Sequence, residues 1–297
     1  MSSVYWLARG GSTLAKWTPR PVRHTLGSVV SAGSYLGWRA KRLVTVQNMA
    51  QVTGRTPRDP YVQRLAMASW YNYGRYASDF MYFPHMDAAV LEANMRDLSQ
   101  DGTWSQFLDK ALKPGKGAIV ASAHFGSWDL AGVLVGRHFP LSAVAETFSD
   151  TRLNDLLQNQ RREKGIAIIP LESSARRILR VLQKNEPVAL VVDRPLSPQE
   201  GTPVKFFGRT TYVPSGPATL AVMSGAAIFP GYVWYGHHHE FYVRGFEPIF
   251  PRPCKGAAER EEEVLRLTQS IYDVLEIMVR EWPSQWYMFR PFWPPAP

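Results

Sequence analysis

Residues 117–132 read GAIVASAHFGSWDLAG, and this stretch decides the fold that the sequence predicts. Residues 117–123 are small and β-favouring, which indicates a buried strand that ends before His124. Gly126 supplies the conformational freedom of a turn, and Ser127 belongs to the residue types that begin a helix. We therefore interpret the stretch as a strand-turn-helix unit with a histidine at the carboxyl end of its strand.

The alternation of strand and helix continues along the chain. Further strands are expected at 141–146, 166–170 and 187–193, and helices at about 127–137, 150–163 and 173–184. This alternation predicts crossover connections, and therefore an α/β fold with a mostly parallel central sheet flanked by helices. In such sheets, ligands bind beyond the carboxyl ends of the strands. The residues that end three of these strands are expected to converge on one crevice: His124, Glu146, Asp193 and Arg194.

Helical patterns also flank this alternating region. They are expected at 21–42, 60–80, 86–98, 102–112, 214–224 and 257–281. Two apolar segments, AAIFPGYVWY and EFYVRGF, indicate a β-hairpin joined through GHHH. The histidines of that turn, residues 237–239, lack further ligand residues at a spacing that suits a metal. A polar turn is therefore expected there, and no metal site is predicted.

Positive charge is concentrated at the N-terminal end of the chain. The formal net charge is +9, from 34 Lys+Arg and 25 Asp+Glu. Nine basic residues precede the first acidic residue, Asp59, so the whole excess lies before it. We therefore expect two parts: a basic, aromatic, membrane-associating segment over 1–58 and a single α/β catalytic domain over 59–297.

The composition of residues 1–58 favours a lipid surface. Trp6, Trp17 and Trp38 accompany the basic residues, a combination typical of elements at an anionic membrane surface. Nucleic acid would attract the same charges, but tryptophan gains most at a lipid interface, so no nucleic-acid partner is expected. The alternative is a helix that packs its aromatic side chains into the core and exposes its arginines. No apolar run approaches the ~18 residues that span a bilayer.

His124 and Asp129 are candidates for a catalytic pair. On a continuous helix, side chains five residues apart point ~140° away from each other. The two can meet only if His124 lies in the turn and Asp129 in the first turns of the helix. A carboxylate bonded to one imidazole nitrogen fixes the tautomer, so the other nitrogen can accept a proton. Cys254, in a proline-rich loop, is remote, so the pair suggests direct attack by a substrate hydroxyl on an activated acyl group; the alternative is a chance spacing.

The residues around this pair resemble a known family. AHFGSWDLAG is similar to the H-x4-D/E block of the lysophospholipid acyltransferase superfamily. The closer resemblance is to its bacterial branch of phosphatidylinositol mannoside acyltransferases and lipid A late acyltransferases. Further blocks of that branch follow in order: VVDRPL with GTPVKFFGR, VPSGPATLAVMSGAAIFP, and WPSQWYMFRPFW. The resemblance covers the chain from about residue 43 to its end.

The resemblance implies a role for several residues. His124 would be the base and Asp129 its orienting partner, the donor would be acyl-coenzyme A or an acylated acyl carrier protein, and the acceptor a lipid hydroxyl. Glu200 would contact the histidine, and Arg161 or Arg162 would bind the donor phosphate or the oxyanion. The alternatives for these three residues are an exposed loop and a solvated helix face.

Two arginines are candidates through their own chemistry. Arg194 and Arg209 carry guanidinium groups that suit anionic substrate groups. For Arg194 the alternative is a structural pairing with Asp193. No cofactor is predicted besides the donor substrate.

The sequence therefore predicts a membrane-associated O-acyltransferase, peripheral on the cytoplasmic side of the cell inner membrane or plasma membrane. The wording FFGR and QWYMF favours a phosphatidylinositol mannoside as acceptor, and lipid A is the alternative. A non-catalytic lipid-binding protein is the alternative from another class. The His124–Asp129 pair argues against that last reading.

Overall fold

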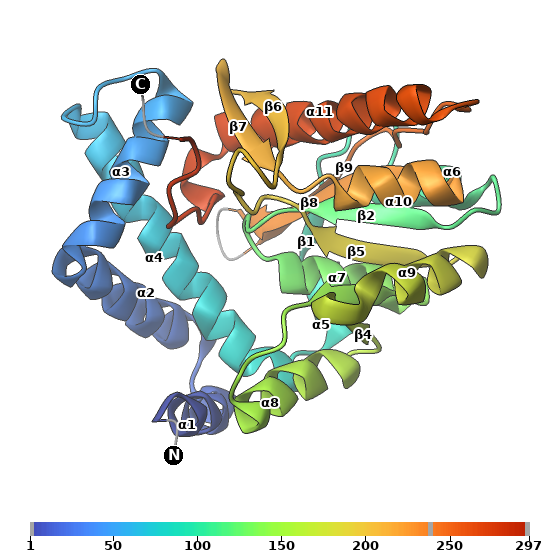
Figure 1. Ribbon diagram of the computed structural model, residues 1–297. Helices are drawn as coiled ribbons and strands as arrows, with labels where there is room; N and C mark the ends of the chain where they lie inside the picture. The colour runs from blue at the N-terminus through green and yellow to red at the C-terminus, as the bar shows by residue number, and fades with distance from the viewer. Residues whose placement is uncertain (1–2, 237–239, 295–297) are drawn as a thin grey trace.

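A seven-stranded sheet forms the centre of the protein, as the computed structural model shows for residues 3–236 and 240–294 (Figure 1). Its order is β1-β9-β8-β2-β5-β3-β4. The strands are β1 Met95–Asp97, β2 Ala118–Ser122, β3 Ser142–Ala145, β4 Ala167–Pro170, β5 Pro187–Val191, β8 Ala227–Tyr235 and β9 Phe241–Gly245. Every neighbouring pair is parallel except the β8–β9 hairpin. The α/β class and the mostly parallel sheet are confirmed; the turn at 237–239 lies outside the described residues.

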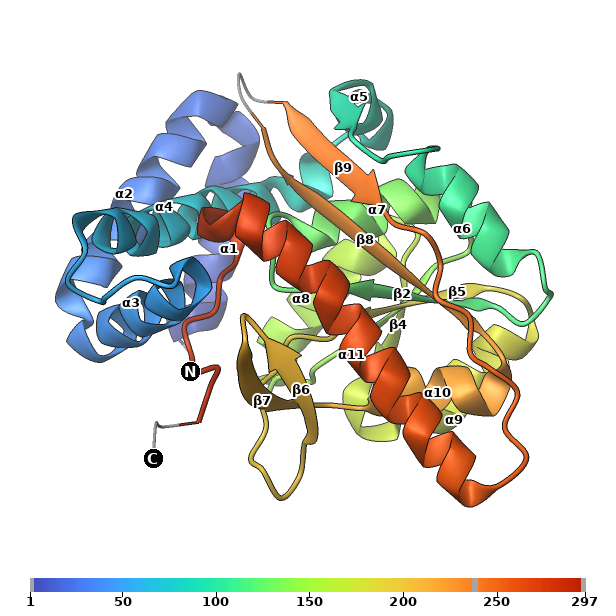
Figure 2. The same ribbon diagram turned by 90° about the horizontal axis from the view of Figure 1, so that it is seen from above.

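Helices cover both faces of this sheet. They are α5 Ala88–Ala93, α6 Trp104–Leu112, α7 Trp128–His138, α8 Thr151–Arg162, α9 Ser174–Gln183, α10 Gly216–Ser224 and α11 Ala257–Glu281. Helices α6 and α7 pack on one face, while α9 and α10 pack on the other. Figure 2 looks onto α11, which runs alongside β8 in this view. Each face has its own hydrophobic core, because successive residues of a strand point to opposite faces.

The N-terminal third is helical and stands beside the sheet (Figure 1). It consists of α1 Ser3–Trp17, α2 Arg20–Gly37, α3 Arg39–Thr53 and α4 Pro60–Tyr82. The single helix predicted over 21–42 is wrong: the chain breaks at Trp38, where φ is −96° and ψ is 74°. Helices α2 and α4 cross where Gly27 meets Gly74, so closely that a Cβ on Gly74 would lie 2.3 Å from the Gly27 carbonyl oxygen. Only glycine permits this approach.

Helix α2 has its polar side chains inside and its apolar side chains outside. Ser28 and Ser31 donate hydrogen bonds to backbone carbonyls of α4, at 3.1 and 2.6 Å. His24 Nε2 lies 2.8 Å from the buried carboxylate of Asp79 on α4. The apolar side chains on the outside are exposed: Val22, Leu26, Val29, Val30 and Leu36. This arrangement is the reverse of that expected for a helix whose outer face meets water.

Two further segments differ from the sequence prediction. The helix expected over 86–98 ends at Ala93, and β1 follows because Met95–Asp97 pairs with β9. A hairpin of β6 Thr202–Phe206 and β7 Arg209–Val213 was not predicted and forms a separate two-stranded sheet. Both depend on pairing partners that local sequence does not reveal.

In the part of the chain that the structure describes, no helix is long and apolar enough to cross a membrane.

Candidate active site

The turn between β2 and α7 places His124 at the carboxyl edge of the sheet. Gly126 has φ of +56°, and a Cβ there would lie 2.3 Å from the Val233 carbonyl oxygen. The C-terminal segment holds this turn from outside: Gly126 N donates to Gln285 O at 2.8 Å, and Tyr287 N donates to His124 O at 2.8 Å. The predicted strand-turn-helix unit is confirmed. Ser127 occupies the N-cap position of α7, but its side chain makes no capping hydrogen bond.

The carboxylate that holds His124 belongs to Asp193. Strands β2 and β5 are paired in parallel, with Ser122 opposite Val191, so the residues two further along each strand also meet. His124 Nδ1 lies 2.8 Å from Asp193 Oδ1, and the His124 backbone N–H donates to both carboxylate oxygens at 3.0 and 3.1 Å. Trp286 Nε1 donates to Asp193 Oδ2 at 2.9 Å. Three donors therefore fix a fully buried carboxylate.

Asp129 has other partners. It lies in the first turn of α7, as the sequence predicted. Its carboxylate accepts hydrogen bonds from Tyr76 Oη at 2.8 Å and from Arg161 Nε at 2.7 Å. The expected hydrogen bond between His124 and Asp129 is not formed, because Asp193 holds Nδ1 of the imidazole. Asp129 instead fixes Arg161, whose Nη1 also donates to Gln158 at 3.0 Å.

The electrostatics of His124 suit a base. The His124 side chain is 46% accessible, and it lines a cavity. Burial has the largest effect and lowers the pKa of His124, but the Asp193 carboxylate outweighs it and holds the pKa above its usual value. A carboxylate at Nδ1 leaves the proton there, so Nε2 is the basic nitrogen. Nε2 has no hydrogen-bond partner within 3–236 and 240–294.

Asp193 and Arg161 stay charged. Burial alone would raise the pKa of Asp193, but the charge of His124 and the hydrogen bonds from His124 and Trp286 hold it below its usual value. Burial would lower the pKa of Arg161, and Asp129 raises it above its usual value. Burial and the nearby Asp129 carboxylate raise the pKa of Tyr76 well above its usual value, so the phenol remains a donor.

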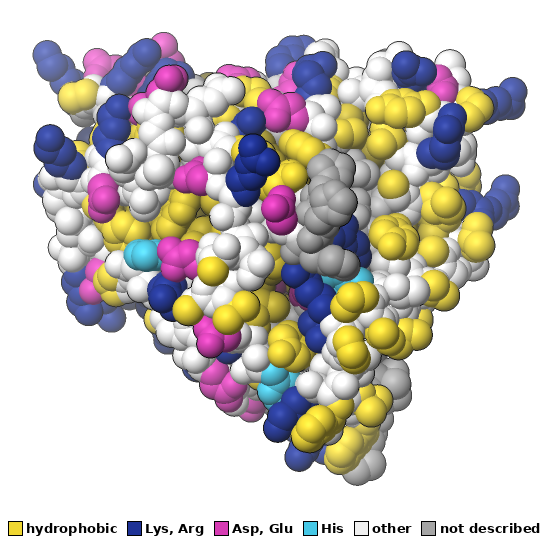
Figure 3. All heavy atoms as spheres, turned by 180° about the vertical axis from the view of Figure 1, so that it is seen from behind, with side chains coloured by type: hydrophobic (Ala, Val, Ile, Leu, Met, Phe, Trp, Pro, Cys, Tyr) yellow, Lys and Arg dark blue, Asp and Glu magenta, His cyan; other side chains and the backbone are white. Residues whose placement is uncertain are grey.

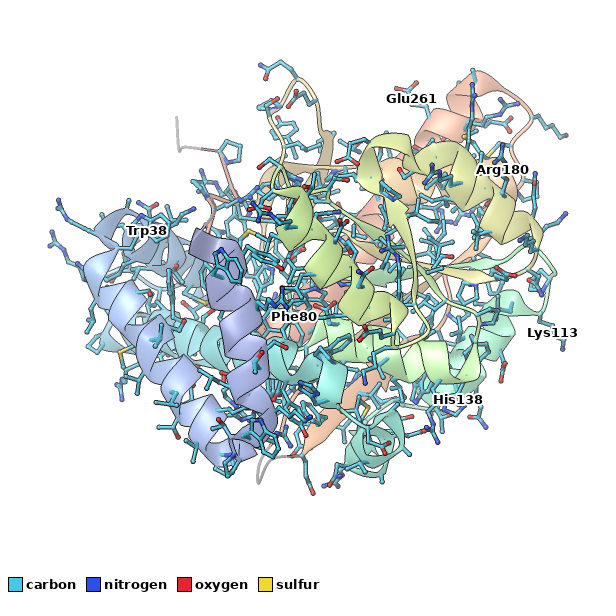
Figure 4. The ribbon with its side chains drawn as sticks, turned by 90° about the horizontal axis from the view of Figure 1, so that it is seen from below. Trp38, Phe80, Lys113, His138, Arg180 and Glu261 are labelled. Carbon is cyan, nitrogen blue, oxygen red and sulfur yellow. The ribbon has the colours of Figure 1, made fainter. Side chains whose placement is uncertain are left out.

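A largely apolar cavity of about 740 Å³ opens beside His124. Its charged lining is gathered near the carboxyl edge of the sheet and includes Lys41, Asp129, Glu146, Arg161, Asp193, Arg194 and Arg290. Phe80 of α4, labelled in Figure 4, lines it near the middle of the molecule and contacts the Arg161 guanidinium. The convergence predicted for the ends of β2, β3 and β5 is therefore present.

Of the other predicted residues, one lines the cavity and three do not: Arg194 lines it, and Arg162, Arg209 and Glu200 lie outside its lining. Arg194 lines the cavity and forms an ion pair with Glu146, rather than with Asp193. Arg162 is exposed and bonds to Asn159 on its own helix. Arg209 Nη2 donates to the Pro294 carbonyl at 2.5 Å. Glu200 is exposed on a loop and bonds to Ser197 Oγ at 2.9 Å, so the structure does not bring it to His124.

Asp193 was expected at the crevice but was given no role, and two further residues of the site, Tyr76 and Trp286, were not predicted. A signal existed for Asp193, because it ends a predicted strand of the same parallel sheet as His124. Trp286 lies in the C-terminal block WPSQWYMFRPFW. The sequence alone does not indicate that this block packs beside the end of β5. Tyr76 lies on α4, and no spacing in the sequence links it to Asp129.

The comparison with family models places the chain among acyltransferases. The model of the bacterial lipid A biosynthesis acyltransferase family matches residues 1–294. The chain belongs to this family and is an acyltransferase.

The chain is also similar to named relatives and to a solved structure. A phosphatidylinositol mannoside acyltransferase of Mycolicibacterium smegmatis is 32% identical over 252 residues, 83% of this chain and 78% of the relative. A protein of the same name from Mycobacterium tuberculosis is 33% identical over 255 residues, 83% of this chain and 75% of the relative. A crystal structure of the 1-acyl-sn-glycerophosphate acyltransferase from Thermotoga maritima aligns with a TM-score of 0.39 at 15% identity, covering 86% of this chain and 99% of that one.

Proposed function

We propose that this protein transfers a fatty acyl chain from an acyl thioester to a hydroxyl of a phosphatidylinositol mannoside. The observation that carries the proposal is His124, which is fixed by Asp193 and lines a largely apolar cavity of about 740 Å³. The names of the relatives supply the acceptor. The donor is acyl-coenzyme A or an acylated acyl carrier protein, whose chain enters the cavity while the thioester stays near His124.

The reaction needs no nucleophile from the protein. His124 Nε2 accepts the proton of the acceptor hydroxyl as its oxygen attacks the thioester carbonyl. The C–O bond forms, and the oxyanion of the tetrahedral intermediate is stabilised by donors around the cavity. Collapse breaks the C–S bond, and the imidazolium returns its proton to the departing thiolate. Asp193 stabilises the imidazolium and fixes its tautomer.

Arg161 provides the cavity with a fixed positive charge. Its Nε and Nη1 are held by Asp129 and Gln158, so the guanidinium cannot turn away from the cavity that it lines. We assign to Arg161 and Arg194 the binding of anionic substrate groups. The roles of Glu200, Arg162 and Arg209 stay predictions from the sequence.

A paired acceptor assay tests the proposed reaction. The purified protein, incubated with palmitoyl-coenzyme A, should release thiol and form an acylated product with a phosphatidylinositol mannoside acceptor. Mass spectrometry of the product and thiol detection measure the two halves of the reaction. Faster transfer to a lipid A precursor would make lipid A acylation the function. Absence of thiol release with either acceptor and with both donor carriers would favour a lipid-binding protein.

We further propose that residues 1–58 hold the catalytic domain, 59–297, on a membrane. Helix α2 turns its serines toward α4 and crosses α4 at paired glycines. It exposes an apolar stripe on its outer side. Helices that pack within lipid use the same arrangement, with small and polar residues between helices and apolar residues outside. Leu14 and Trp17 continue the apolar surface on α1. Figure 3 shows hydrophobic side chains, with Lys and Arg beside them, gathered at the lower end of the molecule, where α1 lies. The negative cytoplasmic leaflet of the cell inner membrane or plasma membrane attracts such charge, so we place the enzyme there, peripherally.

The exposed apolar side chains of α1 should dominate membrane binding. Trp17 is 79% and Leu14 70% exposed, and they lie three residues apart on one face. The Leu14→Ala/Trp17→Ala variant should bind vesicles containing anionic phospholipid at least about tenfold more weakly in a sedimentation assay, since each side chain loses its apolar burial. Met223→Ala on α10, where the side chain is 66% exposed, is the matched control and should bind like wild type. Equal loss in both variants would contradict docking through α1.

A further inference from the structure

The central sheet splits open beside the active site. Strands β3 and β5 are paired only through Ser142 with Val188 and Ala143 with Ala189. Strand β5 stays paired with β2 over all of Pro187–Val191, and β3 stays paired with β4 to its end. The carboxyl halves of β3 and β5 therefore diverge. The residues on the two sides of this gap all line the cavity: Val144, Ala145, Leu190 and Val191.

The cavity is lined by residues of both cores on either side of this gap, which gives it an arm on each face of the sheet. The arm under α7, here called the closed arm, is walled by buried side chains of the core on that face: Leu134, Val135, Leu141, Ile166, Phe229 and Val243. The arm under α9 and α10, here called the open arm, is floored by side chains of the other core: Ile178, Leu190, Leu220 and Tyr232. Its rim is exposed, with Leu171 at 45% and Phe148 at 41%.

The shapes of the arms suit different substrates. The walls of the closed arm are almost inaccessible to solvent, which fits an acyl chain that enters from the thioester and ends in a methyl group. The open arm reaches the surface, so its occupant can continue beyond the protein. Its floor is apolar, and the charged groups of the cavity lie instead around His124, where the polar pantetheine of the donor can find partners. A hydrocarbon chain therefore suits the open arm better than pantetheine does.

The rim of the open arm lies near α1, one of the two helices proposed to face the membrane. Phe148 lies in the loop that leads into α8, and Thr147 Oγ1 in that loop donates to Glu172, beside Leu171, at 2.9 Å. Arg152 in the first turn of α8 packs against the ring of Tyr5 on α1, at 5.6 Å. Helices α1 and α8 lie side by side (Figures 1 and 4). A lipid held at α1 is thus adjacent to this rim.

We infer that the open arm binds a hydrocarbon chain of the acceptor lipid, while the closed arm binds the acyl chain of the donor. The inference rests on the proposed transfer to a membrane glycolipid. His124 lies between the two arms, so one chain on each face of the sheet brings the acceptor headgroup and the thioester to the same imidazole. The acceptor is then recognised by its lipid portion as well as by its sugar hydroxyl.

Matched variants that fill one arm each test the inference. Gly216 lines the open arm, and a Cβ on it would meet no atom within 4 Å, so Gly216→Leu should fold. It should lower kcat/KM about tenfold for the intact glycolipid relative to its deacylated, water-soluble form. Preference along a series of acyl-coenzyme A donors of increasing length should stay unchanged. Ala143→Leu, which fills the closed arm, should do the opposite and shift the preferred donor to shorter chains.

A second open-arm variant makes the result independent of Gly216. Leu171→Asp places a charge on the exposed rim and should reduce the same acceptor ratio. If Gly216→Leu and Leu171→Asp shift the donor chain-length preference and leave the acceptor ratio unchanged, the open arm belongs to the donor and the inference is overturned. It is also overturned if neither variant changes either quantity. Failure of the proposed function appears separately, as absence of transfer by the wild-type enzyme.

Discussion

Replacing His124 with alanine should lower kcat for acyl transfer about a thousandfold. General-base catalysis by a positioned side chain is worth ~10²- to 10⁴-fold. Among the residues that the structure describes, no nucleophile or second base lies within hydrogen-bond distance of His124 other than Asp193, which is buried. The KM for the donor should change little, because the donor's chain is bound by the apolar cavity. Initial rates of thiol release and of product formation, measured with palmitoyl-coenzyme A and phosphatidylinositol mannoside, give both parameters.

Two controls are needed for the His124→Ala variant: one for folding, and one for the loss of a histidine elsewhere in the protein. The imidazole faces a cavity, so its loss leaves the core packing in place, and thermal unfolding should remain cooperative. His138→Ala provides the matched control: His138 lies at the exposed C-terminal end of α7 (Figure 4), is not among the residues that line the cavity, and has its Nε2 2.7 Å from Glu92 Oε1. It should retain wild-type activity. Full activity of the His124→Ala enzyme would contradict the proposed mechanism.

Local sequence was sufficient for most of the fold. The strand-turn-helix unit at His124 was predictable because glycine at a positive φ and a continuous apolar strand leave few other conformations. Helix α11 was expected at 257–281 and spans Ala257–Glu281. The sheet edge was not predictable, because Met95–Asp97 is a strand only through its pairing with Phe241–Val243. The break at Trp38 was hidden in the same way, since it follows from the packing of α2 and α3 against α4.

The site was predictable only where spacing along the chain implied proximity. The resemblance to an acyltransferase family located His124, and the α/β pattern indicated that Asp193 would lie at the same edge. Which carboxylate holds the imidazole depends on the register of β2 and β5, and the sequence does not state that register. The H-x4-D/E block of the family resemblance instead favoured Asp129. The inverted polarity of α2 was also hidden, because the sequence shows an amphipathic helix without telling which face is covered.

The clearest test of the site compares Asp193→Asn with Asp129→Asn. The Asp193 carboxylate offers two oxygens to three donors, His124 N, His124 Nδ1 and Trp286 Nε1. An amide offers one oxygen and turns its NH₂ toward a donor, so it favours the wrong imidazole tautomer. We expect kcat to fall about 10²- to 10⁴-fold. Asp129→Asn should have a smaller effect on kcat and a larger effect on thermal stability, because it leaves the largely buried Arg161 without its charge partner.

The pH profile separates the two carboxylates. The base must be neutral, so kcat/KM rises with pH through the pKa of His124 in the free enzyme. Burial lowers that pKa and Asp193 raises it, so removing the Asp193 charge should move the acid limb to lower pH. Asp129 raises the same pKa more weakly, so Asp129→Asn should leave the acid limb close to that of wild type. If Asp129→Asn moves the limb further than Asp193→Asn, the working enzyme pairs His124 with Asp129, as the H-x4-D spacing implies, and the assignment of Asp193 as the positioning residue is wrong.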